Sequence, residues 1–231
     1  MARSLSWYFG SNEYTNFTYD ISEKCEKYLT IFIANALDRS HEEVISYLKE
    51  IKNNAEIREY FMELVPRTEE RYFADLPIKF GRRVGWYVLL RILKPRIVVE
   101  SGVDRGIGTC VLAAAMLRNA EQGYSGKIIG LDINPYAGRY VAEPYSSVVD
   151  LVFGDSLEFL RHIGNEIDVF IHDSNHSREH EAREYELVGL KLSHRGVIVS
   201  DNAAVTDCLY EFAKKRSMVF SYWQEEVILW D

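Results

Sequence analysis

The most informative segment of the sequence lies in the middle of the chain and reads Val98-Val99-Glu100-Ser101-Gly102-Val103-Asp104-Arg105-Gly106-Ile107-Gly108. An apolar run ends there in an acid, and glycines follow before a helical pattern over residues 108–119. Glycine lets the backbone turn tightly and lie close to a ligand. The spacing departs from the GxGxxG fingerprint of dinucleotide-binding proteins, because Asp104 stands where the second glycine would be. An acid before the first glycine instead suits a ligand with a cationic end.

Short apolar runs recur on the carboxyl side of this stretch, and helical patterns separate most of them. Buried strands that alternate with helices predict a parallel sheet covered on both faces, a doubly wound α/β fold. The predicted strands are 97–99, 127–131, 148–153, 168–172 and 196–200, and the predicted helices are 84–93, 108–119, 177–192 and 205–216.

The first third of the chain has helical patterns in place of alternating strands and helices. An irregular, aromatic arm over residues 1–20 precedes helical spacing over 22–37. A capping box at Ser40 opens a second helix, and a third begins near Asn54 and ends before Pro66. We therefore expect two parts, an N-terminal arm and helical extension over 1–77 and a ligand-binding core over 78–231. Aromatic side chains of the arm either form a substrate lid or pack on the core or a partner subunit; they are Tyr8, Phe9, Tyr14, Phe17 and Tyr19.

Composition excludes several classes of function. The net charge of the 231 residues is −8, and no stripe of lysine and arginine supplies the positive field that a nucleic acid needs. Three widely spaced cysteines suit neither a disulfide framework nor a CxxC metal site, and favour a reducing cytosol. The first residues lack the apolar core of a signal peptide, and no stretch reaches the ~18 apolar residues of a membrane span. We expect a cytoplasmic protein that binds neither nucleic acid nor membrane.

Acidic side chains stand at or just past the ends of five predicted strands, namely Glu100, Asp132, Asp155, Asp173 and Asp201. Ligands of open α/β sheets bind outside the carboxyl ends of the strands, so these acids predict one polar crevice. A carboxylate at Asp132 can accept the hydrogen bonds of both ribose hydroxyls, and Asp155 can receive an exocyclic amine. Both features favour a nucleoside-containing ligand.

The motif Glu100-x-Gly102-x-x-x-Gly106-x-Gly108 resembles the first motif of class I S-adenosylmethionine-dependent methyltransferases. Asp132 matches the ribose-binding acid of that family, and Gly154-Asp155-Ser156 resembles its adenine-side motif. The resemblance spans about residues 78–216 and implies a Rossmann-like, mostly parallel, seven-stranded sheet. It implies S-adenosylmethionine as the cofactor, held by Glu100, Gly102, Gly106, Asp132, Asp155, Ser156 and Asp173.

The next two strand ends carry Asp173 and the pair Asp201-Asn202, an all-oxygen set that suits Mg²⁺ or a similar divalent cation. This pattern resembles the metal-dependent, catechol-type O-methyltransferases. Those enzymes carry a lysine where this chain has His176. The pattern Asp173-x-x-His176 is more similar to that of bacterial methyltransferases that act on sugars and other small molecules. The alternatives without a role in catalysis are that Asp201-Asn202 is a turn and helix-cap pair and that His176 is a surface or capping residue.

These resemblances imply transfer of a methyl group to a hydroxyl oxygen of a small molecule, with His176 as general base and Asp173 beside it in the catalytic site. Neutral imidazole suits that role, because its ordinary pKa is about 6.5. His172 and His180 stand nearby as alternative bases, although alternation turns His172 toward a helix, and His180 and Glu184 fit a solvated helix face. A role in natural product biosynthesis is consistent with this chemistry.

Three alternatives remain: a metal-independent N- or O-methyltransferase, a binding module that has lost catalysis, and an NAD-dependent oxidoreductase, which the glycine spacing disfavours. The C-terminus departs from the family pattern. Residues 218–223 can make one strand, and residues 225–230 follow too closely for an ordinary hairpin. A reduced edge strand would need cover, which leaves a homo-oligomer open.

Overall fold

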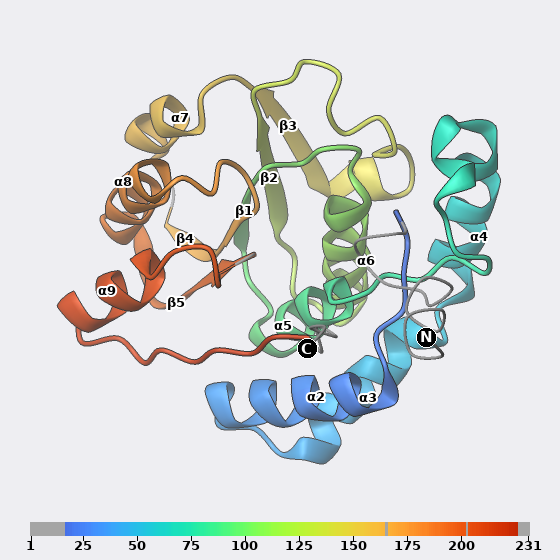
Figure 1. The fold of residues 1–231 in the computed structure, drawn as a ribbon, viewed down its shortest axis with the longest axis horizontal. Helices are drawn as coiled ribbons and strands as arrows, with labels where there is room; N and C mark the ends of the chain where they lie inside the picture. Colours follow the sequence, from blue (N-terminus) through green and yellow to red (C-terminus); the bar gives the residue numbers. More distant parts are fainter. Residues whose placement is uncertain (1–16, 165, 202, 226–231) are drawn as a thin grey trace, which may run out of the picture. The chain divides into compact units, whose positions relative to one another are not determined.

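The computed structural model describes residues 17–164, 166–201 and 203–225, and divides the chain into two compact units (Figure 1). One unit comprises residues 1–92 with 221–231, and the other comprises residues 93–220. The expected functional boundary at residue 77 stays a prediction. The first unit is helical, with α2 (Glu23–Leu37), α3 (His41–Lys52), α4 (Ala55–Leu64), η1 (Val65–Arg67), η2 (Glu69–Tyr72) and α5 (Arg83–Leu93).

Side-chain caps set the starts of the first three helices. The Oγ atom of Ser40 accepts a hydrogen bond from the amide of Glu43 at 3.2 Å, and Ser22 and Asn54 cap α2 and α4 in the same way. After α4 the chain enters the short 3₁₀ turn that contains Pro66. The three predicted helices of this part are therefore confirmed.

Three of the five aromatic residues of the predicted lid, Tyr8, Phe9 and Tyr14, lie outside the described residues, which begin at Phe17. Tyr19 is buried within the first unit, and its hydroxyl group contacts the guanidinium of Arg82 at 3.2 Å. The backbone at Gly81 adopts a φ of +54°, and a Cβ atom there would lie 2.3 Å from the Tyr19 ring. Tyr19 therefore packs inside its own unit, whereas the lid role of the other aromatic residues stays a prediction.

The second unit is built on one parallel sheet of five strands in the order β3-β2-β1-β4-β5. The strands are β1 (Ile97–Ser101), β2 (Lys127–Asp132), β3 (Val149–Phe153), β4 (Ile167–His172) and β5 (Leu192–Ser200). The helical segments are α6 (Ile107–Glu121), η3 (Tyr145–Val148), α7 (Ser156–His162), α8 (Arg178–Gly189) and α9 (Cys208–Lys215).

Helices cover both faces of this sheet (Figure 1). The apolar helix α6 lies on one face, and α7, α8 and α9 lie on the other. On the second face, side chains of three strands pack with Leu160, Tyr185 and Phe212, which the three helices contribute. Burial on both faces explains why the strands are apolar along their length, and the predicted doubly wound α/β fold is confirmed.

The predicted number of seven strands is wrong for the described residues, which form five. Residues 218–225 make no strand. The chain leaves α9 through Ser217, which has a φ of +54°, and Met218 then packs against the core while Val219 is exposed. The ring of Phe220 packs edge-on against that of Tyr210, with 5.4 Å between the ring centroids. The apolar pattern of this segment therefore reflects packing against α9 and the core, and residues 226–230 lie outside the described residues.

The strand order reverses between β1 and β4, and the two backbones meet closely there. The amide of Asp173 donates a hydrogen bond to the carbonyl oxygen of Ser101 at 2.8 Å, and that of Gly102 donates to Leu131 at 2.9 Å. A Cβ atom on Gly102 would lie 1.9 Å from the carbonyl oxygen of Asp173, and the φ of Gly102 is +93°. Only glycine fits this position, which is the switch point where such sheets bind ligands.

No helix of the described chain combines the length and the apolar character needed to cross a bilayer. The three cysteines, Cys25, Cys110 and Cys208, are buried thiols.

We expect Gly102→Ala to lower the free energy of unfolding by about 3–5 kcal/mol, because it adds both left-handed strain and a clash with the β4 backbone. The matched control is Gly123→Ala. Gly123 has a φ of +86° but no atom within 4 Å of an added Cβ, so this variant should lose only about 1–2 kcal/mol. Urea unfolding of both variants measures the difference, and equal losses would show that the close approach of β1 and β4 is not a constraint.

Candidate functional site at the carboxyl edge of the sheet

The Asp132 carboxylate at the end of β2 holds the glycine-containing loop after β1. Its Oδ2 atom accepts hydrogen bonds from the amides of Val103 at 3.0 Å and Asp104 at 2.9 Å. Its Oδ1 atom accepts another from the amide of Asn134 at 2.8 Å. The predicted ribose acid therefore also shapes the loop that would receive the cofactor, and its contact with ribose stays a prediction.

Glu100 and Gly106 occupy the two ends of that loop. Glu100 is buried at the end of β1, and its Oε2 atom accepts a hydrogen bond from the hydroxyl group of Thr109 on α6 at 2.6 Å. Gly106 caps α6 with a φ of +95°. The first turn of α6 is thus tied to β1, and its amino end opens at the carboxyl edge of the sheet, a suitable place for a polar ligand.

The predicted adenine-side motif follows β3. Asp155 is exposed and caps α7 by accepting a hydrogen bond from the amide of Leu157 at 2.8 Å. The hydroxyl group of Ser156 is instead directed at the buried Glu184 carboxylate of α8, to which it donates a hydrogen bond. An adenine contact by either residue stays a prediction; the exposure of Asp155 is consistent with one.

Asp173 and Asp201 occupy equivalent places on neighbouring strands. His172 and Ser200 pair in the β4–β5 register, and the amide of Asp201 donates to the carbonyl oxygen of His172 at 2.8 Å. Each aspartate directly follows one of these paired residues, so their backbones lie side by side at the sheet edge. Two of the three predicted magnesium ligands are thus brought together, and the third, Asn202, lies outside the described residues.

His176 lies beside this pair of acids. Its Nε2 atom is 3.8 Å from Oδ1 of Asp173, and its Nδ1 atom is 3.6 Å from Oε1 of Glu181 on α8. About a quarter of each of the His176 and Asp173 side chains is exposed, at 23% and 25%. Both groups therefore reach a surface from which a substrate can approach, as the predicted catalytic pair requires.

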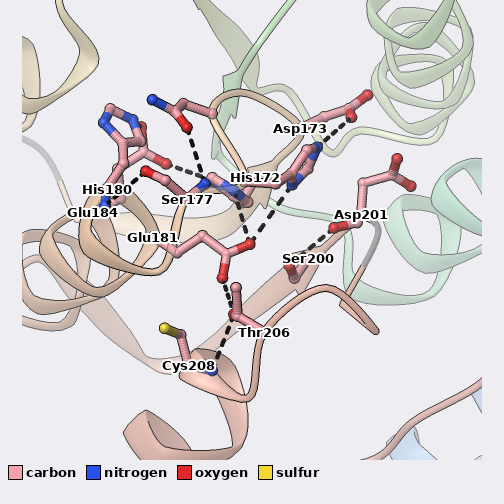
Figure 2. A network of polar contacts seen from close by, with 12 residues as sticks. His172, Asp173, Ser177, His180, Glu181, Glu184, Ser200, Asp201, Thr206 and Cys208 are labelled. Atoms are coloured by element: carbon pink, nitrogen blue, oxygen red, sulfur yellow. Dashed lines mark hydrogen bonds and ion pairs between the residues drawn. The ribbon is translucent and has the colours of Figure 1, made fainter.

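A buried polar cluster lies behind His176, and sequence reasoning missed it. His172 donates a hydrogen bond from Nδ1 to Oε2 of Glu184 at 2.6 Å (Figure 2). Oε1 of Glu184 accepts another from the hydroxyl group of Ser101 at 2.6 Å. Glu181 lies on the other side of the His172 ring, where its Oε2 atom accepts a hydrogen bond from the hydroxyl group of Thr206. This cluster ties α8 to the ends of β1 and β4.

The prediction that Glu184 lies on a solvated helix face is wrong, since Glu184 is fully buried. The buried residues of α8 are Glu181, Glu184, Tyr185 and Val188. Their spacing is that of an inward-facing helical stripe, and it was the signal available in the sequence. The prediction that His172 faces a helix is confirmed, because its partners Glu181 and Glu184 both lie on α8.

The hydrogen bonds of Glu184 determine its charge. Burial alone would raise its pKa, but the hydrogen bonds from His172, Ser101 and Ser156 outweigh burial and hold the pKa below its usual value. Glu184 is therefore an ionised acceptor, and Nδ1 of His172 must carry the proton that it shares with Glu184. The Nε2 atom of His172 lies 3.3 Å from Oε1 of Glu181, and a ring whose one proton is on Nδ1 directs a lone pair there.

Comparisons with known proteins agree with this architecture. The sequence pattern of a family described as methyltransferase domain matches residues 99–203. The SAH-bound methyltransferase PaMTH1 of Podospora anserina is similar in structure, with 16% identity and a TM-score of 0.53 over 76% of this chain and 85% of that one. A methyltransferase of Geobacter sulfurreducens has 20% identity and a TM-score of 0.53 over 76% of this chain and 88% of that one.

The structural likenesses show a shared fold, and the sequence over residues 99–203 is similar to a methyltransferase domain. The predicted resemblance to class I S-adenosylmethionine-dependent methyltransferases is thereby confirmed. A search of curated proteins finds no match to this chain.

We expect Glu184→Gln to lower the free energy of unfolding by about 3–5 kcal/mol, because it removes the charge that the buried hydrogen-bond donors surround. Glu179→Gln is the matched control on the same helix. Glu179 is exposed and pairs only with Arg183 among the described ion pairs, so its loss should stay within about 0.5 kcal/mol. Urea unfolding compares the two variants. Similar small losses would show that the cluster does not stabilise the sheet edge.

Proposed function

We propose that this protein transfers the methyl group of S-adenosylmethionine to a hydroxyl oxygen of a small molecule, since residues 99–203 are similar to a methyltransferase domain. The observation that carries the proposal is the convergence of Gly102, Asp132 and Asp173 at the carboxyl edge of one parallel sheet. That edge is where open α/β sheets bind their ligands.

The loop between β1 and α6 suits the cofactor. Gly102 has no side chain to obstruct the switch point, and the acids Glu100 and Asp132 supply negative charge beside it. S-adenosylmethionine carries a cationic sulfonium and a free amino group, so an acidic, glycine-lined loop complements it. We assign cofactor binding to Glu100, Gly102, Gly106 and Asp132, and the adenine side to Asp155.

Asp173 and Asp201 fit a hard divalent cation, because their carboxylates follow paired positions of β4 and β5. We propose Mg²⁺ as this ion, with Asn202 as the third ligand. Such an ion would draw a substrate hydroxyl group to the site and stabilise negative charge on its oxygen.

His176 is placed to remove the hydroxyl proton. Its Nε2 atom lies beside Asp173 and its Nδ1 atom beside Glu181, and in the tautomer with the proton on Nδ1 the lone pair of Nε2 can accept a proton. The proton of the substrate moves to Nε2, the freed oxygen forms a bond to the methyl carbon, and the bond from that carbon to sulfur breaks. S-adenosylhomocysteine and the methyl ether are the products. Positioning and proton removal supply the catalysis, since the sulfonium methyl group is already electrophilic.

The test is release of S-adenosylhomocysteine from S-adenosylmethionine in the presence of phenols, catechols and sugars, each assayed with Mg²⁺ and with EDTA. We expect turnover with at least one hydroxylated acceptor, lost in EDTA and restored by Mg²⁺. His176→Gln should lower kcat by about 10²–10⁴-fold, the usual contribution of a general base.

His180→Gln provides the comparison, because Nε2 of His180 contacts the buried Glu184 at 3.2 Å rather than Asp173. It should keep most of the wild-type kcat. Turnover that persists in EDTA would contradict the Mg²⁺ assignment and favour a metal-independent methyltransferase. Equal activity of His176→Gln and the wild type would contradict the assignment of the base.

A further inference from the structure

Two buried acceptor atoms face each other beside His176. His172 is fully buried and Glu181 is 1% exposed, and the distance between His172 Nε2 and Glu181 Oε1 is 3.3 Å. Neither atom has a hydrogen-bond partner among the described residues. When the one proton of the His172 ring is on Nδ1, toward Glu184, no hydrogen atom stands between the other nitrogen and Oε1 of Glu181. A buried pair of this kind needs a cation between its members.

A third donor completes the arrangement. Nδ1 of His176 lies 3.6 Å from the same Oε1 atom of Glu181, and one ligand atom from each of His172, His176 and Glu181 falls within 4.8 Å of the others. The two imidazole rings stand nearly perpendicular, at 89°. Ligands of a tetrahedral metal with bonds of about 2.1 Å are separated by about 3.4 Å, so the spacing around Glu181 matches that of a coordination shell.

We propose that His172, His176 and Glu181 form a second cation site, which binds a divalent first-row transition-metal ion such as Zn²⁺. Two imidazole nitrogens and one carboxylate oxygen select such ions over Mg²⁺, which prefers oxygen. The site is therefore chemically distinct from the oxygen site at Asp173 and Asp201.

The surroundings hold each buried ligand in place. Glu184 fixes the ring of His172 through Nδ1, as carboxylates commonly do for metal-binding histidines. The hydroxyl group of Thr206 donates a hydrogen bond to Oε2 of Glu181 (Figure 2). The other oxygen, Oε1, lies beside both His172 and His176. His176 is partly exposed and provides the route by which an ion enters.

Occupancy of this site has a consequence for the proposed methyl transfer. An imidazole that coordinates a metal through Nδ1 carries its proton on Nε2, so it cannot also accept a proton there. Binding of Zn²⁺ and proton acceptance by His176 therefore exclude each other, and the site makes the enzyme sensitive to inhibition by transition metals. The binding itself does not depend on methyl transfer.

The test is a titration of chelator-treated, full-length protein with Co²⁺ in excess Mg²⁺ and without S-adenosylmethionine. We expect one equivalent of Co²⁺ to produce visible absorption bands of a nitrogen-ligated ion of low coordination number, and Zn²⁺ to abolish them. Glu181→Gln should weaken Co²⁺ binding by at least about 10–100-fold. His162→Gln is the control, since the side chain of His162 is 74% exposed and contacts Glu158 on its own helix.

Circular dichroism checks that the Glu181→Gln variant is folded. If that variant is unfolded, the His176→Gln variant takes its place in the Co²⁺ titration. Absence of stoichiometric Co²⁺ binding to the wild type would overturn the proposal and show that a proton bridges His172 and Glu181. Equal binding by the wild type and a folded ligand variant would overturn it as well. Neither result bears on turnover in the acceptor assay, so the two proposals fail separately.

Discussion

The close approach of β1 and β4 at Gly102 and Asp173 is the constraint on which the site depends. A side chain at Gly102 would overlap the carbonyl oxygen of Asp173, so the two strand ends meet only because the residue is glycine. This approach brings the loop that Asp132 holds next to the loop that carries His176. The cofactor-binding and catalytic halves of the proposed site are thus joined by backbone geometry rather than by a flexible segment.

The buried cluster around His172 gives the same edge its rigidity. Glu184 connects α8 to β1 through Ser101, to β4 through His172 and to α7 through Ser156. Ionic groups buried this deeply stabilise a fold only when each has a partner, and Glu184 meets that condition. Glu181 is different, because one of its oxygens faces a second acceptor, and this difference is what points to a metal ion.

The sequence predicted the parallel sheet well because its strands are buried on both faces and are therefore apolar along their length. It predicted α6 and α8 from their periodicity, but it missed α7, which has only seven residues. The apolar residues 218–223 suggested a strand, although an apolar pattern alone cannot show whether a segment pairs with a neighbour or packs against a helix. The structure gives the second outcome for Met218 and Phe220.

The sequence predicted where the candidate site lies on the sheet, but not the buried polar cluster behind it. Acids at successive strand ends identified the edge correctly, because parallel strands bring their carboxyl ends together. The partners of Glu184 could not be read from the sequence, since Ser101 lies 83 residues away and comes close only through the strand order. Charged residues on a helix usually face solvent, and the buried stripe of α8 is an exception that only its spacing signals.

Calorimetric titration with S-adenosylhomocysteine tests whether the carboxyl edge of the sheet binds S-adenosylmethionine, as proposed. Asp132 and Asp168 offer a matched pair, because each carboxylate accepts two hydrogen bonds from backbone amides next to β1. Asp168 does so at the start of β1, from Arg96 and Ile97, and Asp132 does so after its end. We predict one-to-one binding to the wild type, unchanged affinity for Asp168→Asn and at least about tenfold weaker binding for Asp132→Asn. Absence of binding to the wild type, or equal weakening in both variants, would contradict the account.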